Sequence, residues 1–299
     1  MKNYPRTLGT SFLLLLLAIF ACHKSIINTH QPNLLPNGLD SLLITASDST
    51  VAHTRPFPQT PMTGCNQLNY GNSIIYPQPT TGQDYIVSPI NNPGPGKYLA
   101  WPAGMSIDSL TGAIDLTASE TGQQYAIGFV KTGTTDTCIS YLTIGGASYM
   151  DSIYNIGKGS GTAFPYFDGN PNIASICGSS PNGSAACSFD VTGSATNHKM
   201  VIDKSTGEID LKKSLNGIFG IHPVNGQTAA ITIYYQLDDA SNRALQHIQV
   251  DVVYYDTQAD MTTGLVGMIK NKHAAELAVQ LISPNNNPRP PLIIIVRHD

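Results

Sequence analysis

The chain has 299 residues, of which 41% are hydrophobic and only 12% are charged, and it contains 27 glycines and 20 prolines. This composition is typical of turn-rich β structure and argues against long solvated helices and coiled coils. The formal net charge is −4 with only 16 Lys and Arg residues, which gives no electrostatic basis for binding nucleic acid.

The first residues have the pattern of a bacterial export signal. Lys2 and Arg6 precede an apolar run over residues 12–20, which is too short to span a bilayer. The run ends in Ile19-Phe20-Ala21-Cys22, which resembles the lipobox of bacterial lipoproteins except at Phe20. The resemblance implies that residues 1–21 are a signal peptide and that lipid on Cys22 holds the chain to a membrane. The expected location is the outer membrane, either surface-exposed or facing the periplasm. An ordinary secretory peptide is the alternative.

Residues 22–62 are predicted to be a tether. They mix Asn, His, Pro, Ser and Thr, and they end in the proline-dense segment Arg55–Pro61. Proline runs favour extended polyproline II geometry, which would hold a folded domain away from the membrane.

Four cysteines follow the lipobox. In an oxidising compartment they predict two disulfides, with three possible pairings. Cys177 and Cys187 bracket a stretch rich in Gly, Ser and Asn, so we predict that they pair and that Cys65 pairs with Cys138. A zinc site is the alternative, but the sequence has no CxxC pair and no nearby HxxxH.

A twelve-residue motif occurs twice in the chain. Met105–Leu116 recurs as Met200–Leu211 with eight of twelve positions identical. In each copy apolar residues alternate on either side of an Asp-x-x-x-Gly turn. The aspartate can accept backbone N–H bonds and the glycine can adopt positive φ. We therefore predict two structural turns, at Asp108 with Gly112 and at Asp203 with Gly207.

The stretch Trp101–Asp108, with the Thr-Gly-x-Ile that follows it, resembles the cadherin-like and immunoglobulin-like repeats of bacterial surface proteins. The second copy lacks the Pro-x-Gly lead. The resemblance implies a mainly β fold with two such sandwiches in tandem, over residues 63–147 and 148–257, and short strands with frequent turns agree with it. Trp101 is expected in the first core. The chain as a whole also resembles surface lipoproteins of the Bacteroidetes.

The last part, residues 258–299, is predicted to add a C-terminal helix and a strand. Residues 263–282 have apolar side chains at roughly helical spacing, and Leu292–Val296 is a strongly apolar strand. We expect this strand to join the sheet of the second module, with the helix packed outside it as a crossover.

Ion and cofactor sites have little support in the sequence. True cadherins bind calcium between domains, and Asp238 with Asp239 are the least poor candidates here, but no cadherin-type calcium motif is present. No cofactor is predicted. The eight histidines are dispersed and none stands in a catalytic or metal-binding motif.

Three hypotheses for function follow. The first is a non-catalytic surface lipoprotein whose sandwiches serve in adhesion, spacing or assembly. The second is a glycan- or peptide-binding lipoprotein associated with an outer-membrane uptake system. The third is a hydrolase. The lipid anchor makes the membrane one partner in all of them, and the other partner is an unidentified protein or glycan.

Overall fold

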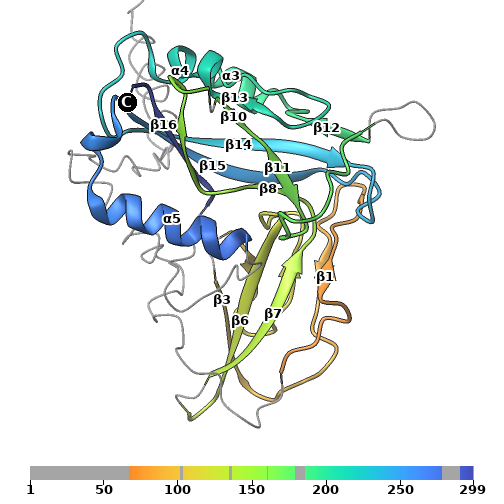
Figure 1. Ribbon diagram of the computed structural model, residues 1–299. Coiled ribbons are helices and arrows are strands. Elements are labelled where there is room, and N and C mark those ends of the chain that lie inside the picture. The colour runs from red at the N-terminus through yellow and green to blue at the C-terminus, as the bar shows by residue number, and fades with distance from the viewer. Residues whose placement is uncertain are drawn as a thin grey trace, which may run out of the picture. The chain divides into compact units, whose positions relative to one another are not determined.

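The computed structural model describes residues 67–101, 104–134, 137–159, 161–178, 186–277 and 290–298. The expected signal peptide, Cys22, the tether and Cys65 lie outside these residues. The described chain is mainly β, with several sheets and a C-terminal helix, as the sequence predicted (Figure 1). None of its helices is long and apolar enough to cross a membrane.

The first module, strands β1 to β7, is made of two facing sheets. One has the order β1 (Ile74–Ile75), β7 (Thr137–Ile144), β6 (Gln123–Lys131) and β3 (Gly96–Trp101), and the other β2 (Ile86–Val87), β5 (Ile114–Asp115) and β4 (Ser106–Ile107). Alternate residues of these strands turn inward and form a single core, which includes Tyr98, Ile114, Leu116, Tyr125, Ile127 and Phe129.

Trp101 does not lie in this core, so that expectation was wrong. Tyr98 and Ala100 face inward from β3, and the two-residue period of a strand therefore turns Trp101 to the opposite face of the sheet. There it packs with Ala126 and Ile139 in a separate apolar cluster.

The second module, strands β8 to β16, is built around a five-stranded sheet. Its order is β12 (Cys187–Phe189), β14 (Gln227–Leu237), β15 (Gln246–Tyr255), β16 (Leu292–Val296) and β9 (Ser152–Asn155). Two short pairs, β8 (Ala147–Tyr149) with β11 (Pro165–Phe167) and β10 (Thr162–Ala163) with β13 (Ile209–Asp210), accompany the helices α3 (Ser194–Asn197) and α4 (Leu211–Phe219). The largest apolar core of the described chain lies here.

The C-terminal strand β16 runs parallel to both of its neighbours, β15 and β9. Parallel neighbours need a crossover connection, and the chain here passes through the short helix η1 (Gln258–Asp260) and α5 (Thr263–Leu277). Leu265 and Ile269 of α5 pack on Val253, Ile294 and other residues of the sheet face that points away from the main core, so α5 lies along this sheet (Figure 1). The part of the predicted helix beyond Leu277 lies outside the described residues.

The two modules differ in the neighbour of one strand, which is β1 in the first module and β9 in the second. In the first module β1 pairs directly with β7, in parallel. In the second module β16 lies between β15 and the corresponding strand β9, and β9 is the last strand in the described sheet order. The C-terminal segment therefore supplies both the strand between β15 and β9 and the helix that packs on this sheet.

Candidate binding groove

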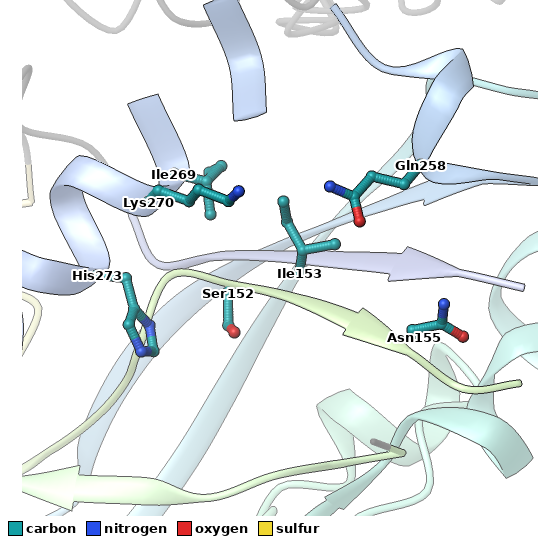
Figure 2. Close-up of a pocket in the computed structure, with 7 residues that line it drawn as sticks. All are labelled: Ser152, Ile153, Asn155, Gln258, Ile269, Lys270 and His273. Carbon is teal, nitrogen blue, oxygen red and sulfur yellow. The ribbon is translucent and has the colours of Figure 1, made fainter. Parts of the chain in front are cut away.

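A groove of about 310 Å³ lies between β9 and the helices η1 and α5. Its lining combines hydroxyl, amide, amine and imidazole groups with two apolar side chains. The lining residues are Ser152, Ile153, Asn155, Gln258, Ile269, Lys270 and His273. Figure 2 shows Lys270 and Gln258 pointing toward each other across the groove, with Ile153 below them and His273 beside Ser152. The volume is at the lower end of the range for small-molecule pockets.

The charge of the groove is cationic to neutral, because no carboxylate is among the lining residues. Lys270 is exposed, and no ion pair to it occurs within the described part of the chain. Nδ1 of His273 lies 2.7 Å from the carbonyl oxygen of Asp151, to which it donates, so Nε2 of the neutral ring is left to accept from a ligand. The donors that the lining offers are the ammonium of Lys270, the amides of Asn155 and Gln258 and the hydroxyl of Ser152. The groove can therefore donate hydrogen bonds to an anionic or strongly polar ligand.

Buried ionic contacts hold α5 against β9 and β16. Nζ of Lys272 lies 3.2 Å from Oδ1 of Asp151 and 4.0 Å from Oε1 of Glu276. The amide of Asp151 donates to Oε2 of Glu276 at 3.0 Å, and the amide of Leu292 donates to Oδ1 of Asp151 at 3.1 Å. Asp151 and Glu276 are buried, so these contacts are little screened by solvent and fix the wall of the groove.

The two predicted turn residues of the first hairpin lie outside the groove. Oδ1 of Asp108 accepts from the amides of Thr111 at 2.7 Å and Leu110 at 2.8 Å, and these bonds lower the pKa of Asp108. Gly112 has a φ of +72° and its amide donates to the carbonyl of Asp108 at 2.9 Å.

The second hairpin repeats these contacts. Oδ1 of Asp203 accepts from the hydroxyl and the amide of Ser205 and from the amide of Thr206, which lowers the pKa of Asp203. Gly207 has a φ of +78°, and its amide donates to the carbonyl of Asp203 at 2.8 Å. Both aspartates thus accept hydrogen bonds from their own turns.

Sequence reasoning missed a tyrosine that binds each turn. The hydroxyl of Tyr70 donates to the carbonyl of Gly112 at 2.7 Å, and that of Tyr149 to the carbonyl of Gly207 at 2.6 Å. The signal was present as a second repeat, Tyr-x-x-Ser-Ile, at residues 70–74 and 149–153. This repeat matches β1 with β9, and its second copy supplies two residues of the groove.

One predicted disulfide is present. Cys177 and Cys187 are bonded with a Cα–Cα distance of 5.2 Å, which is ordinary disulfide geometry. Cys138 is also disulfide-bonded. Its predicted partner, Cys65, lies outside the described residues, so that pairing stays a prediction.

The two weak calcium candidates are at the turn between β14 and β15. Oδ1 of Asp239 accepts from the amide of Ser241 at 2.8 Å, and the amide of Asp238 donates to the carbonyl of Ala186 at 2.7 Å. In the described ranges, His, Cys, Asp and Glu side chains form no group of three or more that could hold a metal ion. The geometry therefore adds no support for calcium at this turn.

A half-buried acid, Glu120, lies elsewhere, where the first module meets β15. Burial, and next the carboxylate of Asp251, raise the pKa of Glu120 to about 8. Gln123 donates to Oε2 of Glu120 at 3.0 Å, and the amide of the next residue, Thr121, donates to the carbonyl of His247 at 3.1 Å. A raised carboxyl pKa is common in catalytic acids, but structural contacts cause the same shift, and Glu120 is not among the residues of the groove.

Comparison with known proteins gives only weak similarities. No protein-family model matches the chain, and no curated protein matches it. Among solved structures, a SusE-like, surface-located polysaccharide-binding protein from the heparin utilisation locus of Bacteroides thetaiotaomicron is 14% identical, with a TM-score of 0.23. The match covers 65% of this chain and 34% of that protein.

Drosophila N-cadherin EC1–4 is 8% identical, with a TM-score of 0.18, over 63% of this chain and 47% of that one. The chain thus spans less than half the length of either structure. Both similarities are weak and agree only with a β-rich chain.

Proposed function

We propose that the protein is a non-catalytic, membrane-anchored binding protein of the cell surface, which holds a glycan or a peptide in the groove between β9 and α5. In this proposal the lipid on Cys22 anchors the chain, the first module acts as a spacer, and the second module carries the ligand site. The protein would collect material for an outer-membrane uptake system.

The observation that carries the proposal is the composition of the groove. Its walls offer several hydrogen-bond donors and one exposed ammonium group, which can bind and orient a polar ligand. Hydrolysis by general acid–base catalysis usually relies on a pair of groups with separated pKa values, such as two carboxylates. The lining residues supply no carboxylate, so binding is the chemistry that the groove supports best.

The position of the groove also supports a spacer role for the first module and ligand recognition by the second. It exists where the inserted strand β16 and helix α5 meet β9, and the first module has no such insertion within its described residues. A module made only of the repeated sandwich is suited to spacing, whereas the module with added elements is suited to recognition.

The test is a binding screen with the mature chain carrying Cys22→Ser, against arrays of oligosaccharides and of peptides. Ligands captured by this chain should bind roughly tenfold or more weakly to Lys270→Glu. They should bind unchanged to Lys131→Glu, which makes the same charge reversal on an exposed lysine of the first module. Equal loss in both variants, or capture that ignores Lys270→Glu, would contradict the proposal.

A further inference from the structure

The inference that follows rests on the proposed function and names the ligand class of its groove. It starts from the backbone of β9. The amide of Ile156 donates to the carbonyl of Val296, and this bond shows which residues of β9 point their peptide groups toward β16. Because neighbouring residues of a strand point their N–H and C=O groups in opposite directions, those of Ile153 face away from β16.

Among the described residues, the outward edge of β9 is unpaired at Ile153. In the described part of the chain no hydrogen-bond partner contacts the N–H or C=O of Ile153, and no strand pairs with β9 on this side. An exposed strand edge is a template for pairing with another extended chain. Natural proteins protect such edges with charge, proline or a covering element, and Ser152–Asn155 contains neither a charged residue nor a proline.

The groove runs along this edge. Ile153 supplies both the outward peptide groups and an apolar wall, while α5 supplies Ile269, Lys270 and His273 on the other side (Figure 2). A strand added beside β9 would place alternate side chains into the space under α5. Strand addition of this kind takes its affinity from main-chain hydrogen bonds and its selectivity from side-chain pockets.

The chemistry of the lining favours an acidic peptide over a neutral glycan. Lys270 can contact a carboxylate, and no carboxylate of the lining competes for it. The lining also has no Phe, Tyr or Trp side chain on which a sugar ring could stack. We propose that the groove binds an extended peptide segment that adds as a strand to the edge of β9, with an acidic side chain or terminal carboxylate at Lys270.

The test selects ligands from a random heptapeptide library on the mature chain with Cys22→Ser. Selected peptides should be acidic and free of proline at their centre. Ile153→Pro removes the outward N–H without touching the ladder to β16, so it should weaken binding roughly tenfold or more. Ile153→Val keeps the N–H and should bind as the parent does.

The first module provides the matched control. Ile74 holds the equivalent place in β1, and the bonds from Thr143 to Ser73 and from Gly145 to Ile75 show that its N–H also points outward. Ile74→Pro makes the same chemical change at a strand outside this groove and should leave peptide binding unchanged.

Each other outcome overturns the peptide proposal. Failure to select any peptide above the Lys270→Glu background would do so, as would equal loss in Ile74→Pro and Ile153→Pro. Oligosaccharide binding that depends on Lys270 but not on the N–H of Ile153 would reject the peptide and keep the groove. Dimerisation of the chain that is lost in Ile153→Pro would assign the edge to a second copy. If neither peptides nor oligosaccharides depend on Lys270, the proposed function fails as well.

Discussion

Ile74 and Ile153 hold equivalent places in the two modules but have different neighbours. Ile74 pairs with Thr143 in β7, whereas Ile153 pairs with Ile294 in the inserted strand β16. The pairing of Ile153 separates β9 from β15 and leaves room for α5 on the same sheet face. The groove of the second module thus lies beside a strand whose counterpart in the first module has a different neighbour.

The half-buried Lys272 and the exposed Lys270 of α5 should affect different properties. Lys272→Met removes the ammonium group that contacts the buried carboxylates of Asp151 and Glu276 and should lower the free energy of unfolding by about 3–5 kcal/mol. Lys270→Met, two residues earlier on the same helix, should change the free energy of unfolding by less than about 0.5 kcal/mol. Only this second change should weaken ligand binding in fully folded protein. Urea denaturation and a titration on the same samples separate the effects, and a stable Lys272→Met chain would contradict the assigned role.

The turn glycines should be intolerant of valine. A Cβ at Gly112 would lie 2.5 Å from the ring of Tyr98, and one at Gly207 would lie 2.6 Å from the ring of Phe189. Strain at positive φ costs about 1–3 kcal/mol, and the ring contacts should add to it. Gly133→Val is the control, since its φ is +82° but nothing lies within 4 Å of the added Cβ. Thermal denaturation measures all three, and an equal cost at Gly133 would show that the rings contribute nothing.

How much the sequence predicts depends on how local each feature is. The Asp-Gly turns could be predicted because a few adjacent residues form their hydrogen bonds, and Cys177 with Cys187 are separated by one loop. The groove could not be predicted, because β16 brings together residues over a hundred positions apart through a parallel register that leaves no trace in spacing. The prediction for Trp101 was wrong because the side chains of β3 alternate between two faces, and the sequence alone does not say which face lies toward the core.

The two tyrosine hydroxyls should contribute similarly if the modules share one design. Tyr70→Phe and Tyr149→Phe each remove one hydrogen bond to the carbonyl of a turn glycine and leave the ring in place. Each should lower the free energy of unfolding by about 1–3 kcal/mol, the usual cost of leaving a buried polar group without its partner. Tyr141→Phe, on an exposed ring, should cost little. Chemical denaturation of the three variants measures this, and a large cost for only one of the buried tyrosines would contradict the equivalence.

Stability should fall as pH rises through the range set by Glu120. Its pKa is about 8 in the folded chain against an ordinary value of 4.5. Between these values the unfolded chain has released the proton that the folded chain keeps. The free energy of unfolding should therefore decrease with rising pH, by on the order of 1 kcal/mol per pH unit.

Glu120→Gln imitates the protonated acid and should remove this slope, whereas Glu208→Gln on the second hairpin should retain it. Urea denaturation at about pH 5 and about pH 8 measures the difference. A slope that persists in Glu120→Gln would assign the pH dependence to other groups.

The most direct test of the account is residue-resolved amide hydrogen exchange of the full mature chain, with and without a saturating selected peptide. Strand addition at the groove predicts that exchange of the Ile153 amide slows roughly tenfold or more on binding, because this N–H gains a hydrogen bond. The Ile74 amide, at the equivalent place in the first module, should exchange at the same rate in both samples. Unchanged exchange at Ile153 with the peptide bound would contradict the assignment of the groove as the binding site.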